Sequence, residues 1–283
     1  MKHISKLLKE RLPQKAALKS GWDFIDNELG GYHPGELMTV CGVENSGKTA
    51  FILSQIDRLA VEQRIPTLIG FGLMDMSMVV ASMMAYHYDI ETNDLWNLWD
   101  NPLYQEEIAE YESMLREAPL FVVKEDLQDD NLLEELRDRI VDNGIQIAFF
   151  EDFEIYTSLN TSSELRRLAV MSNIPVIKSE LIWRDRKDGE RLVSLSDMNT
   201  REWGAISSMS DTVLAFNDYE FMKIFMDERG VNLRGVLGIE ILKQKGAISQ
   251  KLYRLFKKRL YYRTRFSDSD YDVPVPRPIV EHI

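Results

Sequence analysis

Residues 37–49 read Leu37-Met38-Thr39-Val40-Cys41-Gly42-Val43-Glu44-Asn45-Ser46-Gly47-Lys48-Thr49, an apolar run that passes into the pattern G-x-x-x-x-G-K-[ST]. Glycine lets the backbone curl so that consecutive N–H groups face phosphate oxygens. A helix beginning there adds the positive end of its dipole. Because the motif follows an apolar strand and precedes a helical pattern, residues 42–49 predict a phosphate-binding loop, or P-loop.

The motif assigns a role to each part of this loop. Lys48 is expected to reach the β- and γ-phosphates of ATP, and the Thr49 hydroxyl is expected to bind Mg²⁺. The remaining loop residues would surround the phosphates, and these are Gly42, Glu44, Asn45, Ser46 and Gly47. The predicted cofactors are therefore ATP and Mg²⁺.

A second acidic segment follows a later apolar run. Residues 145–150 are apolar apart from Gln146 and are followed directly by Glu151 and Asp152. An acid at the carboxyl end of a buried parallel strand lies beside a P-loop, where it can serve Mg²⁺. The alternative is that both acids only end a core strand. With a complete P-loop upstream we favour the metal role, and the sequence leaves open which of the two acids serves it.

Strand-like and helix-like patterns alternate along the chain, which favours a mostly parallel sheet with helices on both faces. Strands are expected at 37–41, 67–73, 120–123, 145–150, 175–177, 212–216, 236–242 and 251–256, and helices at 49–62, 77–86, 104–117, 131–141 and 163–171. No long helix separates the last three strands, so we expect them to be antiparallel additions at one edge. The fold class is therefore α/β, of the P-loop NTPase type.

Composition restricts the remaining possibilities. The 283 residues include a single cysteine, Cys41, so an intrachain disulfide and a Cys-rich zinc site are excluded. Cys41 lies in an apolar run and is expected to be strand core. No apolar stretch approaches the length of a membrane span, and a cytoplasmic protein is expected. The net charge of −12 argues against a broad nucleic-acid-coating surface, although it allows a narrow basic channel.

Several segments resemble, in order, the ATPase domain of DnaB-type replicative helicases within the RecA-like superfamily. Besides the P-loop they include Ser20–Asp26, Leu73–Ser77, Asn173–Glu180 and Lys243–Gly246. The resemblance implies a RecA-like ATPase domain at 20–266 and a linker-like helix at 1–19, for which a helix packed on its own domain is an equal alternative. Three prolines within 273–278 predict an extended tail at 267–283. It also implies a homo-oligomeric ring, expected to be a hexamer, that binds single-stranded DNA and works with other replication proteins.

The resemblance also carries over individual roles. Asp75 stands where the family has the glutamate that orients the attacking water, and Glu151 stands where it usually has aspartate. Lys243 and Lys245 match the basic residues that reach a neighbouring subunit, with Lys245 at the arginine-finger position. Asp75 is one methylene shorter than glutamate and lysine lacks the fork of arginine, so nucleotide binding is better supported than fast hydrolysis. Asp75 has an alternative role as a helix N-cap.

A glycine-containing loop at 183–191 is the predicted DNA contact, because the resembling family projects a loop into its channel here. Its cations are Arg184, Arg186, Lys187 and Arg191. The alternative is a solvated hairpin, since three acids offset most of the charge. A basic, aromatic stretch at 254–265 also suits single strands, but an edge hairpin is the favoured interpretation there.

The sequence thus predicts an ATP-dependent helicase-like motor that moves on single-stranded DNA in replication. One alternative is a scaffold of the same fold that binds ATP to assemble and hydrolyses it weakly, which the substitutions at Asp75 and Lys245 favour. Another is a recombinase-like DNA-binding ATPase, suggested by the pair Lys243 and Lys245.

Overall fold

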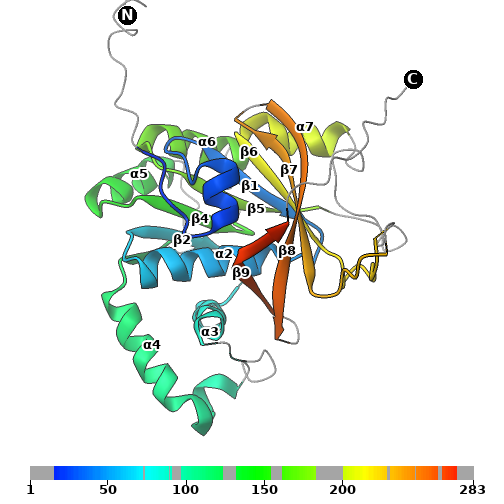
Figure 1. The fold of residues 1–283 in the computed structure, drawn as a ribbon. Coiled ribbons are helices and arrows are strands. Elements are labelled where there is room, and N and C mark those ends of the chain that lie inside the picture. The colour runs from blue at the N-terminus through cyan, green and yellow to red at the C-terminus, as the bar shows by residue number, and fades with distance from the viewer. Residues whose placement is uncertain are drawn as a thin grey trace, which may run out of the picture.

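The computed structural model describes residues 16–72, 74–88, 90, 97–123, 132–153, 161–182, 200–227, 230–245, 247–260 and 263–272, with side chains placed except at 200–202, 250–260 and 263–272. Within these residues nine strands form one sheet in the order β3-β2-β4-β5-β1-β6-β7-β8-β9. Figure 1 shows helices on both sides of this sheet. The predicted α/β class is confirmed.

Six neighbouring strands are parallel. In sheet order they are β3 (Leu120–Val123), β2 (Thr67–Phe71), β4 (Ile147–Glu151), β5 (Val176–Leu181), β1 (Leu37–Gly42) and β6 (Thr212–Asp218). All residues of β1, β2 and β4 are buried, as the continuous apolar runs of a sheet covered on both faces require. Cys41 is fully buried in β1, which confirms its place in the core.

The other strands form an antiparallel edge. They are β7 (Val236–Gln244), β8 (Ala247–Leu260) and β9 (Arg263–Asp272). The expectation that 212–216 would be antiparallel is wrong, because β6 runs parallel to β1 and the change of direction comes only at β7. Helix α7 (Thr200–Met209), which the sequence patterns did not predict, precedes β6 and supplies the crossover. Strand β9 crosses residue 266, where the ATPase domain was predicted to end.

Each face of the sheet has its own helices and its own core. One core joins the sheet to η1 (Phe24–Leu29), α2 (Lys48–Ile56), η2 (Asp57–Glu62), α3 (Met76–His87) and α4 (Gln105–Glu117). The opposite face packs against α5 (Leu132–Asp142), α6 (Thr161–Ser172) and α7. The short 3-10 helix η4 (Pro102–Tyr104) precedes α4, which extends away from the sheet in Figure 1.

The helix expected at 49–62 changes its winding partway. After α2 ends at Ile56, the chain continues as the π-helix η2, whose last turn is closed by the bond from the Gln63 N–H to the Arg58 carbonyl, 3.0 Å. None of the helices in the described part of the chain combines the length and apolar character that a membrane span requires.

Candidate functional site

The P-loop is shaped by close backbone packing. It leaves β1 at Gly42, where an added Cβ would lie 2.4 Å from the Ser46 hydroxyl and 2.8 Å from the carbonyl oxygen of Phe216. Gly47 has φ 95° and is the N-cap of α2, and Asn45 has φ 58°. These left-handed residues let the loop turn back over the start of α2. The structure therefore has the strand–loop–helix arrangement that the motif requires.

Lys48 lies within this loop. Its ammonium donates hydrogen bonds to the carbonyl oxygens of Gly42, 3.1 Å, and Val43, 2.9 Å. Burial lowers the pKa of Lys48, and the nearby carboxylates of Glu151 and Asp152 oppose that shift. The cation is thus held at the inner side of the loop, beside the helix N-terminus.

Glu151 meets the P-loop at the carboxyl edge of the sheet. The Thr49 hydroxyl donates a hydrogen bond to its Oε1. Its Oε2 is buried and has no hydrogen-bond partner among the described residues. Burial raises the pKa of Glu151 to about 6, and the bond from Thr49 opposes the rise. Asp152 is exposed with φ 45°, and its N–H donates to the Ser179 hydroxyl, 2.9 Å. Glu151, not Asp152, therefore contacts Thr49.

Asp75 lies just beyond β2, the neighbour of β4, and it is the N-cap of α3. Its carboxylate accepts hydrogen bonds from the backbone N–H of Ser77, 2.8 Å, and from the Ser77 hydroxyl. These bonds lower the pKa of Asp75, the hydroxyl contributing most. The side chain is exposed. The capping role that the sequence left as an alternative is present in this structure.

Lys243 and Lys245 lie at the opposite end of the parallel strands from the P-loop. Because β7 is antiparallel to β6, its end at Gln244 lies beside the beginning of β6. The Lys243 ammonium donates to the carbonyl oxygens of Ser207 and Ser210, each at 2.6 Å, at the end of α7. Lys245 is exposed and has φ 50°. Within one chain, neither lysine shares a site with Lys48.

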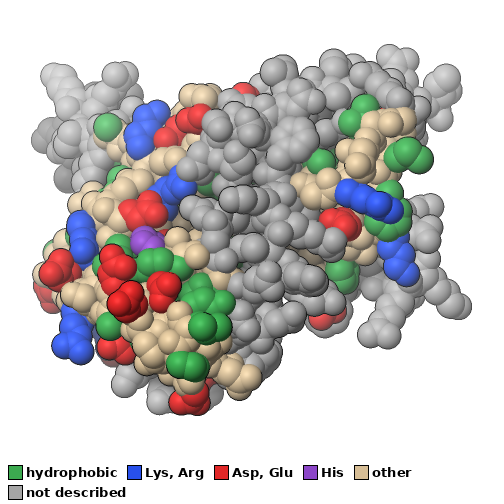
Figure 2. Space-filling model, turned by 60° about the horizontal axis from the view of Figure 1, so that its bottom comes forward, with side chains coloured by type: hydrophobic (Ala, Val, Ile, Leu, Met, Phe, Trp, Pro, Cys, Tyr) green, Lys and Arg blue, Asp and Glu red, His purple; other side chains and the backbone are tan. Residues whose placement is uncertain are grey.

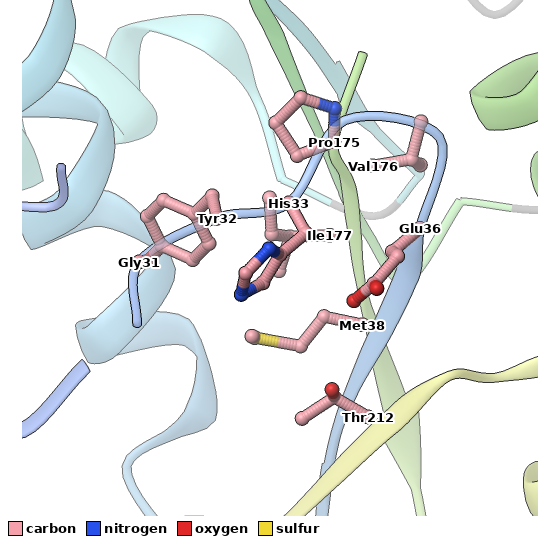
Figure 3. A pocket seen from close by; sticks show the side chains of 9 residues that line it. All are labelled: Gly31, Tyr32, His33, Glu36, Met38, Pro175, Val176, Ile177 and Thr212. Carbon is pink, nitrogen blue, oxygen red and sulfur yellow. The ribbon is translucent and has the colours of Figure 1, made fainter. Parts of the chain in front are cut away.

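A small hollow lies at this same end, and sequence reasoning did not anticipate it. Figure 3 shows His33 and Glu36 pointing into it above Met38. Burial raises the pKa of Glu36, and the positive charges of His33 and Lys245 are among the effects that oppose the rise. Its lining residues are Gly31, Tyr32, His33, Glu36, Met38, Pro175, Val176, Ile177 and Thr212.

Strand β5, between β1 and β4, carries polar groups to which the sequence analysis gave no role. Lys178 in β5 is buried, donates to the Ser162 hydroxyl, 2.6 Å, and pairs with Glu180. A lysine directly after the apolar residues 175–177 was the available signal. The predicted DNA contacts Arg184, Arg186, Lys187 and Arg191 lie outside the described residues, as do residues 1–15 of the predicted linker helix.

The sheet order, with a P-loop after β1 and an acid at the end of β4, defines the chain as a RecA-like P-loop domain. Residues 17–261 match the model of the DnaB-like helicase C-terminal domain, and the chain belongs to that family. It is a helicase-type domain.

Two solved structures share the fold. The first is described as an ATPase domain and has a TM-score of 0.71 at 14% identity, over 92% of this chain and 95% of that one. The second, a DnaB-like replicative helicase described with its interactions with primase, has a TM-score of 0.69 at 13% identity, over 92% of this chain and 66% of that one. No curated protein matches the chain.

Proposed function

We propose that the chain is an ATP-driven motor that binds MgATP at its P-loop and moves on single-stranded DNA as a ring, expected to be a hexamer. The observation that carries this proposal is the bond between Thr49 of the P-loop and Glu151 of β4. It joins the two segments that the sequence assigned to one metal–phosphate site.

The residues present fit Mg²⁺. Thr49 and Glu151 offer only oxygen atoms, which is the donor chemistry of a hard cation. The buried Glu151 Oε2 lacks a hydrogen-bond partner among the described residues, so an oxygen is available for a metal-bound water. When bound, Mg²⁺ neutralises charge on the β- and γ-phosphates. Lys48 adds a second positive charge, and the N–H groups at the start of α2 hold phosphate oxygens.

Turnover needs two further groups. Asp75 would orient the attacking water while capping α3, since both hydrogen bonds from Ser77 are accepted by its Oδ1. Lys245 would stabilise transition-state charge in the site of a neighbouring copy, since its own P-loop lies at the other end of the strands. Lys243 is held by α7 of its own chain, so we assign the cross-subunit role to Lys245 alone.

The weakly hydrolysing scaffold remains a second candidate, and the capping of α3 by Asp75 favours it. The cap occupies Oδ1 of the carboxylate, and a lysine makes a less specific finger than arginine. The recombinase-like alternative depended on Lys243 and Lys245 acting as a pair, and the bonds of Lys243 to α7 do not support such a pair.

The deciding experiment measures ATP hydrolysis with and without single-stranded DNA, together with strand displacement. A motor shows DNA-stimulated hydrolysis and displacement, whereas a scaffold binds ATP and does neither. Lys48→Ala should abolish MgATP binding with the fold intact, because the buried Lys48 bonds only to loop carbonyls and lies outside the hydrophobic core cluster of that face. Arg137→Ala, which removes an exposed cation of α5, is the matched control. Wild-type affinity for ATP in Lys48→Ala would falsify the proposed site.

A further inference from the structure

Three potential metal-binding side chains converge on the face that carries α3 and α4. One ligand atom each from Asp57, Glu62 and His87 lies within 4.8 Å of the others. His87 Nδ1 is 3.0 Å from Asp57 Oδ2 and 3.9 Å from Glu62 Oε1. Asp57 is buried, whereas the Glu62 side chain is 47% exposed. The group is therefore anchored in the core and open to solvent on one side.

The π-helix η2 is what brings Asp57 and Glu62 together. Residues five apart in an α-helix are separated by about 140° around the axis, since each residue turns it by about 100°. A π-helix instead bonds each residue to the fifth one along, so such residues lie nearly one above the other. Asp57 and Glu62 are the first and last residues of η2. Wound as an α-helix, this segment would point Glu62 away from His87.

The surroundings of the group orient its side chains and place negative charge around it. The Tyr111 hydroxyl of α4 donates to Asp57 Oδ1, 2.6 Å, which leaves Oδ2 facing His87. The charged groups that act most strongly on His87 are acids, and Glu110 of α4 joins Asp57 and Glu62 among them. Figure 2 shows acidic side chains gathered on this lower face of the molecule. Metal ligands are commonly oriented by such an outer hydrogen bond, and negative charge around them favours a cation.

We propose that Asp57, Glu62 and His87 bind a divalent transition-metal ion of the zinc type, with water in the fourth position. In a tetrahedral site with bonds of about 2.0–2.1 Å, ligand atoms lie about 3.4 Å apart, and the two separations given above lie on either side of that value. An imidazole nitrogen favours zinc over the hard cations Mg²⁺ and Ca²⁺. The ion would replace the proton shared by Asp57 and His87.

Such an ion would connect η2, which continues the helix that follows the P-loop, to α3. Asp57 and Glu62 follow α2 without a break, and His87 is the last residue of α3. The ion would thus fix the position of α3 relative to α2, while Tyr111 ties α4 to the same point. The site is distinct from the one formed by Thr49 and Glu151, and it requires no nucleotide.

The test is titration of the metal-free full chain with Co²⁺ or Zn²⁺ in excess Mg²⁺, read by Co²⁺ visible absorption, equilibrium dialysis and thermal unfolding. About one ion should bind and raise Tm. Glu62→Gln should weaken binding about tenfold or more, His87→Gln should abolish it, and Tyr111→Phe should weaken it about tenfold. Glu112→Gln, which changes an exposed acid of α4 outside the ligand set, should bind as wild type does.

Two further variants separate this site from others. Glu151→Gln alters the P-loop site and should leave zinc binding unchanged. His33→Gln alters the hollow beside Glu36 and should also leave zinc binding unchanged. Glu62 is exposed, so its glutamine variant keeps the fold even if His87→Gln is destabilised. The proposal is overturned if no saturable binding occurs, or if folded Glu62→Gln binds as tightly as wild type.

Discussion

Asp75 shows how one carboxylate can serve two roles. In this structure it caps α3, and in the proposed mechanism it orients water. Asparagine is as good an N-cap as aspartate but cannot accept a proton. We therefore expect Asp75→Asn to unfold like wild type in urea yet lose ATP turnover, whereas Asp75→Ala loses stability as well. Full turnover in Asp75→Asn would remove Asp75 from the mechanism.

The cap also predicts a pH dependence. Because the hydrogen bonds from Ser77 lower the pKa of Asp75 in the folded state, its contribution to stability is present above the unfolded pKa of about 3.9. That contribution is lost as the pH falls through the folded value. The stability difference between wild type and Asp75→Ala should be constant from neutral pH to about 4 and then shrink on acidification. Urea unfolding at a series of pH values measures it, and a difference that grows on further acidification would contradict the assignment.

At the scale of elements, the P-loop depends on the close approach at Gly42. An alanine there would place Cβ against the Ser46 hydroxyl and the backbone of β6. Since a backbone carbonyl cannot swing aside, we expect Gly42→Ala to cost about 1–3 kcal/mol of unfolding free energy and to weaken ATP binding. Gly204→Ala in α7 is the control, because nothing lies within 4 Å of its added Cβ. It should stabilise the chain by up to about 1 kcal/mol.

Most elements could be predicted from local pattern, and the errors have physical causes. An apolar run such as 212–216 marks a buried strand but carries no sign of direction, which depends on whether a helix precedes it. The helix at 49–62 was found, but its apolar stripe does not distinguish α from π winding over one turn. The edge hairpin favoured at 254–265 is confirmed by the pairing of β8 with β9, but the mostly polar residues after 266 gave no sign that the strand continues to Asp272.

The candidate site, like the fold, could be predicted only in part. The P-loop and the acid after β4 were found because each is a contiguous motif beside a strand. The contact of Thr49 with Glu151, and not with Asp152, depends on the turn at Asp152, which no motif encodes. The group of Asp57, Glu62 and His87 was missed because it combines two separate elements and an unusual helix.

At the scale of the whole molecule, the predicted DNA path can be tested by salt dependence. Neutralising Arg186, Lys187 and Arg191 together should weaken single-strand binding and flatten its slope by up to about three units of log K per log salt. Fluorescence anisotropy at several salt concentrations measures the slope. Neutralising Arg137, Arg139 and Arg116 removes the same charge elsewhere and is the control. An unchanged slope in the loop variant would place the DNA path elsewhere, with residues 257–259 the next candidate.

The shared active site predicts complementation between variants. Lys245→Ala should bind ATP but lose most turnover, because its cation acts mainly on the transition state. Mixed with Lys48→Ala, itself inactive, it should regain activity at interfaces that pair an intact P-loop with an intact lysine. Steady-state hydrolysis of the mixture measures this. If the variants co-assemble without any rescue, Lys245 acts within its own chain or not at all.

The P-loop and the β7–β8 turn lie at opposite ends of the strands. This placement also restricts how copies can associate. A two-fold axis brings the same patch of each copy together, so it cannot join one end to the other. On the proposed role of Lys245, each copy must present its turn to the next in a single direction. Repetition of that step closes on itself or grows as a helical filament, according to the rotation per copy. An open stack therefore ends in one P-loop without a donated lysine, and turnover per chain should rise with stack length until closure.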